Sequence, residues 1–166
     1  MRECSGGPAV ETSAVAATAV QQRLQALLVS PSAGVDHIAY ATRCSRKTIE
    51  LLVRLGFEVV IEMKRVERFN TFASKLRNQK GDVIEVLEPI DPSRRSPVDS
   101  ALINFECAVC HVCYKVDDFD KAFEEFVGLD CVVLTQPFES YIFDGYMVSH
   151  LYHPHLGVFE IFGEKK

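Results

Sequence analysis

An internal duplication constrains the fold of this chain more than any other feature of its sequence. When the sequence is shifted by 74 residues, HIAYATRCSRKTIELLVRLGFEVV, which begins at His37, aligns with HVCYKVDDFDKAFEEFVGLDCVV, which begins at His111. The repeat predicts two similar units that build one domain together. Identical residues coincide at several positions, among them His37 with His111, Tyr40 with Tyr114, Lys47 with Lys121, Leu55 with Leu129, and Val59 with Val133.

The ends of the two units match as well. VIEVLEP and VFEIFGE both carry a glutamate in third place, Glu85 in the first unit and Glu160 in the second. The spacing from histidine to glutamate is 48 residues in the first unit and 49 in the second. Each unit therefore opens on a histidine and closes on a glutamate.

Hydrophobic periodicity predicts the same order of elements in each unit: an alternating strand, a helix and three further strands. Ser45 is expected to cap the first helix, and Asp117 or Asp118 the second. We predict an α+β fold in which two βαβββ repeats form a half-open barrel. The expected elements are residues 35–42, 45–55, 58–66, 70–77 and 82–88 in the first repeat, and 109–116, 119–127, 131–135, 145–152 and 157–162 in the second.

The duplicated domain is expected to span residues 35–163, with a Pro-rich linker, residues 91–108, between repeats at 35–90 and 109–163. Before it, residues 1–34 are predicted to form a flexible leader and an amphipathic helix over residues 12–29. The apolar face of that helix would hold Val20, Leu24, Leu27 and Leu28.

Charge and composition exclude several classes of partner. The net charge of −5 and the pI near 5.5 argue against nucleic-acid binding, which needs a basic surface. No apolar run approaches the roughly 20 residues that span a bilayer, and the N-terminus lacks the features of a signal peptide. Six cysteines in such a chain predict free thiols in a reducing compartment, so we expect a cytoplasmic protein without a membrane partner.

The segment CAVCHVCYKVDD, residues 107–118, is compatible with three interpretations. It contains the Cys-x-x-Cys-His pattern of haem attachment, the close cysteine spacing of a zinc knuckle, and the alternation of a buried strand. Haem attachment normally requires export, and a zinc knuckle needs a second pair of ligands. The match between His111 and His37 favours the strand, in which Cys113 neighbours His111 on one face.

Several segments, in order along the chain, resemble the vicinal oxygen chelate superfamily, which includes glyoxalase I, methylmalonyl-CoA epimerases, extradiol dioxygenases and bleomycin-binding proteins. The likeness is greatest to the methylmalonyl-CoA epimerases and covers most of residues 35–163. Its segments are VDHIAYAT, LGFEVV, VIEVLEPI followed by SPVDSAL, CHVCYKVDD and LYHPHLGVFEIF.

The resemblance implies one divalent metal ion held by His37, Glu85, His111 and Glu160. These imidazoles and carboxylates would converge if the two repeats face one another across a pseudo-twofold axis. Nitrogen and oxygen donors of this kind suit Co, Ni, Mn, Zn or Fe and would leave two octahedral positions for substrate or water. Four such residues on apolar strands are otherwise costly, because an unpaired buried carboxylate costs several kcal/mol.

The implied function is that of a metal-dependent isomerase or epimerase that acts through an enolate of an acyl thioester or related carbonyl compound. Glu160 is the candidate base, by analogy with family members whose ligand carboxylate has two roles. Glu67, in KRVERFN, is the candidate second proton donor, with Glu62 as a weaker substitute. KRVERFN occupies the place of a Pro-Glu-Gln type loop in the epimerases but lacks its proline and its glutamine.

The substrate is expected to be a small carbonyl compound, with a CoA thioester as one candidate, and we also expect a homodimer. A glyoxalase I-like lyase with a glutathione hemithioacetal as substrate, or a non-catalytic small-molecule-binding protein, are the alternatives. His150, His153 and His155 are interpreted as structural or pocket-lining residues. Basic residues in the middle of the chain suit an anionic ligand: Lys64, Arg65, Arg68, Lys75, Arg77, Lys80, Arg94 and Arg95.

Overall fold

The two sequence repeats form the two halves of one sheet. The computed structural model describes residues 33–165, which belong to one compact unit, residues 32–166. The helix expected over residues 12–29 lies outside the described residues. Within the described residues, no helix has the length and apolar character needed to cross a membrane.

Both repeats contain a strand, a helix and then further strands, as the periodicity predicted. The first comprises β1 (Gly34–Thr42), α2 (Ser45–Arg54), β2 (Phe57–Val66), the 3-10 turn η1 (Glu67–Phe69), β3 (Thr71–Asn78) and β4 (Val83–Pro89). A second 3-10 turn, η2 (Asp99–Leu102), follows in the linker. The second repeat comprises β5 (Cys107–Val116), α3 (Phe119–Gly128), β6 (Val132–Val133), β7 (Phe138–Glu139), β8 (Tyr146–His153) and β9 (Gly157–Glu164).

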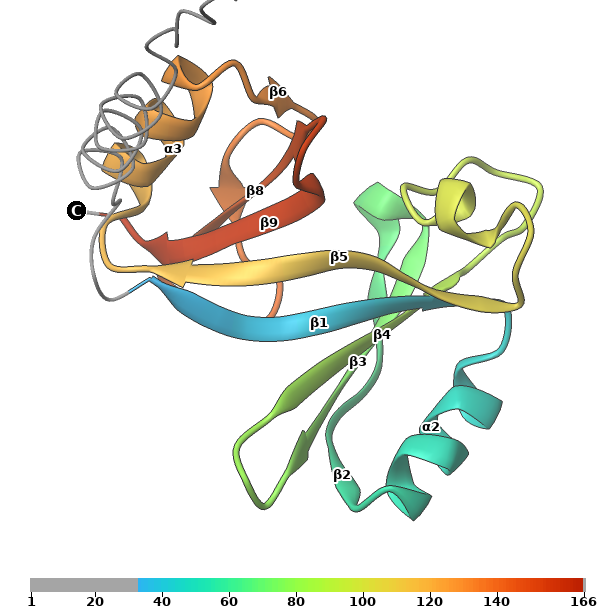
Figure 1. Ribbon diagram of the computed structural model, residues 1–166. Helices are drawn as coiled ribbons and strands as arrows, with labels where there is room; N and C mark the ends of the chain where they lie inside the picture. The colour runs from blue at the N-terminus through green and yellow to red at the C-terminus, as the bar shows by residue number, and fades with distance from the viewer. Residues whose placement is uncertain (1–32, 166) are drawn as a thin grey trace, which may run out of the picture. The chain divides into compact units, whose positions relative to one another are not determined.

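The sheet has a symmetric strand order, β2-β3-β4-β1-β5-β9-β8-β6, with β7 paired to β8. The opening strands β1 and β5 lie side by side and antiparallel at its centre, as Figure 1 shows. Each pairs in parallel with the closing strand of its own repeat, β4 or β9. The α+β class with two repeats is thus confirmed, and the strand order ends at β2 and β6 rather than closing into a ring.

Each helix covers one face of its own half-sheet. Leu52 of α2 packs with Leu76 and Val86 of β3 and β4, whereas Phe119 of α3 packs with residues of β8 and β9 that include Phe159. Because side chains alternate along a strand, the neighbours of these core residues point to the opposite face. Glu85 and Glu160 are among those neighbours, so burial of the helix face directs both glutamates away from the helices.

The local predictions differ from the structure in a few places. The N-cap residue of α2 is Cys44 and not Ser45, and the Cys44 side chain makes no capping hydrogen bond. The Glu88 carboxylate takes that role, because it accepts from the backbone amide of Ser45 at 2.7 Å. Asp118 caps α3 by accepting from the Lys121 amide, as predicted. The predicted strand over residues 131–135 is paired only at Val132–Val133, and the short β7 was not predicted.

The segment CAVCHVCYKVDD lies in and just after β5, which confirms the strand interpretation. Cys113 is fully buried next to the β1 backbone, opposite His37 in the register. Cys110 also lies within the strand, where its thiol donates to the Ala39 carbonyl at 3.4 Å.

Gly163 provides a test of the pairing between β5 and β9. It lies opposite Val116, and an added Cβ would be 2.5 Å from the Val116 carbonyl oxygen and 2.9 Å from its Cγ2. We predict that Gly163→Ala lowers the free energy of unfolding by about 1–3 kcal/mol, because the backbone must shift. Urea denaturation followed by circular dichroism measures this.

The matched control is Gly128→Ala at the end of α3, where an added Cβ meets nothing within 4 Å. Because alanine favours a helix, this variant should be as stable as the parent or up to about 1 kcal/mol more stable. Equal stability of the Gly163→Ala variant and the parent would contradict the close packing of these two strands.

Candidate metal centre

The four predicted donor residues lie together between the two halves of the sheet. His37 comes from β1, Glu85 from β4, His111 from β5 and Glu160 from β9. All four are buried, with exposed fractions of 2%, 7%, 6% and 8% respectively. Residues far apart in the sequence therefore bring two imidazoles and two carboxylates to one place.

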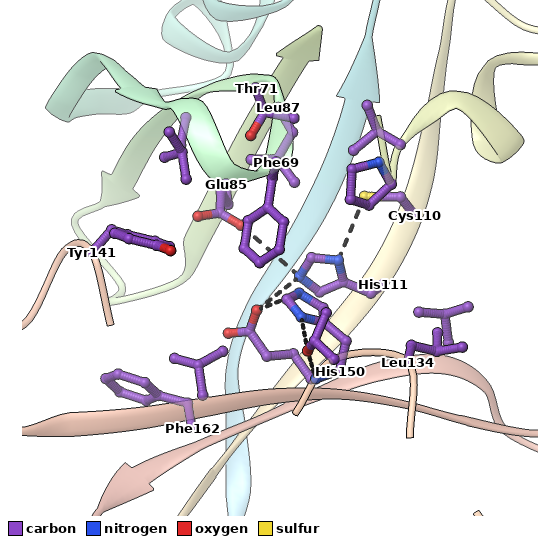
Figure 2. A pocket seen from close by; sticks show the side chains of 18 of the residues that line it. Phe69, Thr71, Glu85, Leu87, Cys110, His111, Leu134, Tyr141, His150 and Phe162 are labelled. Atoms are coloured by element: carbon purple, nitrogen blue, oxygen red, sulfur yellow. Dashed lines mark hydrogen bonds and ion pairs between the residues drawn. The ribbon is translucent and has the colours of Figure 1, made fainter. Parts of the chain in front are cut away.

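Neighbouring donor atoms of this cluster lie close together, in two overlapping groups that share His111. His37 Nε2 lies 3.5 Å from Glu85 Oε2, and His111 Nε2 lies 3.9 Å from the same oxygen and 3.6 Å from Glu160 Oε2. Figure 2 shows Glu85 and His111 pointing toward one another in the pocket. Within the described residues, His37, Glu85 and His111 form one group of possible ligands to a metal ion, and His111, His150 and Glu160 form another.

Two imidazole nitrogens in the cluster lack the partner that burial normally requires. Among the buried side-chain atoms that the structure describes, His37 Nε2 and His111 Nε2 accept or donate no hydrogen bond of normal geometry. An unsatisfied buried polar atom is costly, and such atoms at a functional site indicate a missing ion or water. Both nitrogens face the glutamates, so the residues present fit a divalent cation.

The side chains around the cluster orient its members. Asp36 accepts from Nδ1 of His37 at 2.8 Å, which leaves Nε2 free to bind a metal. Adjacent strand residues normally point to opposite faces, but a register shift between Val35 and His37 brings Asp36 within reach. On the other side, the thiol of Cys113 donates to Glu160 Oε1 at 3.1 Å.

His150 on β8 is a further member of the cluster. Its Nε2 lies 3.0 Å from Glu160 Oε2, its Nδ1 lies 3.1 Å from Thr135 Oγ1, and its ring meets that of His111 edge-on at 5.2 Å (Figure 2). It lines the pocket, in agreement with the sequence analysis, but its contact with Glu160 was not predicted. The sequence carries one signal for it, because His150 precedes Glu160 by ten residues, as Lys75 precedes Glu85.

The charges of the cluster stabilise one another in the metal-free protein. Burial opposes protonation of His37, but its hydrogen bond to Asp36 and the nearby Glu85 carboxylate raise its pKa to about 9. Burial lowers the pKa of His111 to about 4 despite the nearby glutamates. Burial also opposes ionisation of both glutamates. Even so, the nearby His37 lowers the pKa of Glu85, and His150 together with the other histidines lowers the pKa of Glu160. At neutral pH the cluster thus holds two carboxylates and a protonated His37.

The other predicted residues lie apart from the cluster. Glu67 opens η1, is exposed, and pairs with Arg65; its pKa is lowered mainly by that hydrogen bond. It is not among the residues that line the pocket, although Phe69 of the same turn is. His153 ends β8 and His155 lies in the turn before β9, where the His155 amide donates to His153 Nδ1 at 3.2 Å.

A cavity of about 380 Å³ opens beside the cluster. Its walls are mostly apolar, with a few polar groups from the cluster at one end, which is typical of a small-molecule site. Figure 2 shows Phe69, Tyr141 and Leu134 around Glu85, His111 and His150. The loop that carries Tyr141 is held by Lys64 of β2, whose ammonium donates to the Tyr141 carbonyl.

The raised pKa of His37 gives a pH-dependent prediction. A metal ligand must lose its proton, so binding of Co²⁺ at pH 7.5 should release about one proton per ion, and affinity should rise about tenfold per pH unit up to about pH 9. For the metal-free fold the sign is opposite: the stability contributed by protonated His37 is complete below pH 6.5 and is lost as pH rises through about 9.

Calorimetry in buffers of different ionisation enthalpy measures the proton release. Asp36→Asn is the matched variant, because loss of the Asp36 carboxylate removes the largest contribution that raises the pKa of His37. It should release fewer protons than the parent at pH 7.5. Affinity for Co²⁺ that does not change between pH 7 and 9 in the parent would contradict the assignment of His37 as a ligand.

Comparison with solved structures identifies proteins with the same fold. Methylmalonyl-CoA epimerase from Mycobacterium tuberculosis superposes with a TM-score of 0.68 at 16% identity over 85% of this chain and 96% of that one. The Streptomyces coelicolor enzyme in complex with 2-nitronate-propionyl-CoA gives 0.65 at 22% identity over 80% and 97%. A hypothetical protein from Bacillus halodurans gives 0.67 at 18% identity over 81% and 96%. At such identities these matches establish the fold alone.

Comparison with sequence families gives a more specific result. No curated protein sequence matches the chain significantly. The family model described as the glyoxalase, bleomycin resistance protein and dioxygenase superfamily matches residues 36–148, which is more than half of the chain. The chain therefore belongs to the glyoxalase/bleomycin resistance protein/dioxygenase superfamily.

Proposed function

We propose that this protein is a metal-dependent isomerase or epimerase that acts through the enolate of an acyl thioester or a related carbonyl compound. The observation that carries this proposal is the convergence of two unsatisfied imidazole nitrogens with two buried glutamates at the end of an apolar cavity. Few functions other than metal binding account for four such groups in one place.

In the proposal, His37, Glu85, His111 and Glu160 hold one divalent ion, for which Co, Ni, Mn, Zn or Fe are suitable. Such an ion would polarise the carbonyl of a bound substrate and so favour the loss of a proton from the neighbouring carbon. The apolar walls of the cavity would exclude water from that carbon and strengthen the electrostatic interactions within the site.

Glu160 is the proposed base. Its Oε2 is close to His111 and His150, and its Oε1 accepts from the Cys113 thiol. These contacts fix the position of the carboxylate, and the histidines keep it ionised, with a lowered pKa, despite burial. A fixed, ionised carboxylate is suited to accept a proton from a carbon atom held beside it.

Epimerisation needs a second donor on the other face of the planar enolate, and Glu67 remains the proposed residue. Because its carboxylate pairs with Arg65 outside the pocket, η1 would have to turn when substrate binds. The neighbouring Phe69 lines the cavity and lies against the ring of Phe138 at 5.3 Å, so movement of η1 would also change the shape of the cavity.

A CoA thioester is the proposed substrate class. The Streptomyces coelicolor structure is of an epimerase with 2-nitronate-propionyl-CoA bound, which supports a ligand of this kind in the same fold. The guanidinium of Arg68 lies 5.0 Å from the ring of Phe138, a pocket residue, so an exposed cation lies close to the cavity. It is suitable to meet the phosphates of a CoA that extends outward.

The glyoxalase-like alternative rests on Glu85. A carboxylate at this position gives the candidate ligands the order His, Glu, His, Glu along the chain, which resembles that of glyoxalase I. In that case the same cluster would act on a glutathione hemithioacetal. A homodimer and a cytoplasmic location accompany either version of the proposal.

The proposal predicts exchange of the substrate's α-hydrogen. In deuterated water with Co²⁺, the protein should introduce deuterium at the α-position of methylmalonyl-CoA, as measured by mass spectrometry. Glu160→Gln should slow the exchange by about 100-fold or more because it removes the base. Glu139→Gln, at an exposed glutamate on β7, is the matched control and should exchange at the parent rate.

If the protein does not exchange the α-hydrogen but does turn over the methylglyoxal–glutathione hemithioacetal, its function would be that of a glyoxalase-like lyase and not of an epimerase. Activity on neither compound, in protein that carries a metal ion, would contradict both. The metal content of the Glu160→Gln variant is measured in parallel, because a change there would affect exchange indirectly.

Glu67 is tested separately. If it is the second donor, Glu67→Gln should slow epimerisation at least about tenfold, while exchange by the remaining base continues on one epimer. Chiral analysis of the acyl group, combined with deuterium content, distinguishes the two rates. Glu58→Gln, an exposed residue on β2, is the control. Equal slowing of exchange and epimerisation, or no slowing, would remove Glu67 from the mechanism.

A further inference from the structure

Lys75 occupies the position in the first repeat that His150 occupies in the second. Lys75 lies opposite Glu85 in the pairing of β3 with β4, and His150 lies opposite Glu160 in the pairing of β8 with β9. Side chains directly opposite each other share one face of a sheet. Lys75 and His150 therefore both line the cavity.

The two residues differ in their partners. His150 pairs with Glu160, whereas the ammonium of Lys75 forms no ion pair or hydrogen bond with any residue in the described range 33–165, although the side chain is only 7% exposed. Its contacts are aromatic: Nζ lies 5.1 Å from the ring centre of Phe143 and 6.0 Å from that of Phe162. Both rings belong to the second repeat, so Lys75 reaches from one half of the sheet to the other.

A buried ammonium that contacts no carboxylate directly is costly, even though the charge of Lys75 acts on Glu85 and Asp36. The faces of aromatic rings attract a cation and hold it in position, but they do not neutralise its charge. The other basic residues of the middle segment, among them Lys64 and Arg68, are exposed to water, and Lys75 is the only lysine or arginine among the described residues that line the cavity. The position of its charge thus calls for an anionic group from outside the chain.

The charges of the metal cluster point the same way. Glu85 and Glu160 would together balance the formal charge of a divalent ion, so the ion and its two carboxylates offer little net attraction to an anion. Lys75 lies beside this cluster, where its charge contributes to the lowered pKa of Glu85. It can therefore attract a carboxylate to a position close to the carbonyl that the cluster would hold.

We propose that Lys75 binds a carboxylate of the substrate, and that the pocket accordingly selects carbonyl compounds that carry a carboxylate near the reacting carbonyl. This inference rests on the proposed function, because it assigns a second group of the same substrate. Phe143 and Phe162 would position the ammonium for this contact.

Two small ligands of nearly equal shape test the proposal. Monoethyl malonate carries an ester carbonyl and a carboxylate, whereas ethyl malonamate carries a neutral amide in place of the carboxylate. Calorimetry with the full chain loaded with Co²⁺ should show that Lys75→Met weakens binding of monoethyl malonate by roughly tenfold or more. Binding of ethyl malonamate should change less than about twofold, because it lacks the charge that Lys75 recognises.

Lys80→Met, which removes an equal charge from the exposed turn between β3 and β4, should leave the binding of both ligands unchanged. Lys75→Arg should keep most of the preference for the anion, which separates loss of charge from loss of packing. The proposal is overturned if Lys75→Met weakens the binding of both ligands equally or of neither. It is also overturned if the parent protein does not bind monoethyl malonate more tightly than ethyl malonamate. If the protein prefers the carboxylate ligand but does not exchange the α-hydrogen, the proposed reaction would be overturned, whereas the role of Lys75 would stand.

Discussion

The antiparallel pairing of β1 with β5 is the interaction on which the rest of this structure depends. It joins the two repeats and sets His37 opposite Cys113 and His111 opposite Ala39. Each of the two strands then carries the closing strand of its own repeat as a parallel neighbour, which brings Glu85 and Glu160 to the same region. A slip of one residue in this central register would turn the histidines to the opposite face, because side chains alternate along a strand. The position of this histidine and glutamate cluster is therefore a consequence of strand pairing and not of any local loop.

The cluster also shows how the fold accommodates groups that are unfavourable in a core. Two carboxylates and two imidazoles are buried there, and neighbours fix two of the four: Asp36 contacts His37, and the Cys113 thiol and His150 contact Glu160. These neighbours offset part of the cost of burial, but they leave His37 Nε2 and His111 Nε2 unsatisfied. Helices α2 and α3 pack on the opposite face, so the apolar cores that stabilise each half are separate from the site. The two halves can hence support a buried polar cluster between them without loss of their own cores.

Much of the fold could be predicted from the sequence because the duplication doubles each signal. The alternation of β1 and β5, the amphipathic helices and the terminal glutamates occur twice, and the four donor residues followed from their equivalent places. The contacts of Asp36 and His150 could not be predicted in the same way. Asp36 reaches His37 through an irregularity in the strand register, and periodicity assigns it to the wrong face. Lys75 was named with seven other basic residues that suit an anionic ligand, but its burial was not predicted, because it depends on Phe143 and Phe162 of the other repeat. The contacts that could not be predicted are thus those set by irregular pairing or by packing between the halves.

The central claim is that the donors of both repeats bind one ion. Anomalous diffraction from crystals of the protein loaded with Co²⁺, recorded above and below the cobalt absorption edge, tests this most directly. We expect a single strong peak at about 2.0–2.2 Å from His37 Nε2, His111 Nε2 and one oxygen each of Glu85 and Glu160, as for nitrogen and oxygen ligands of divalent first-row metals. A protein that binds no cobalt, or that binds it only at other residues while these four side chains stay as they are, would contradict the account.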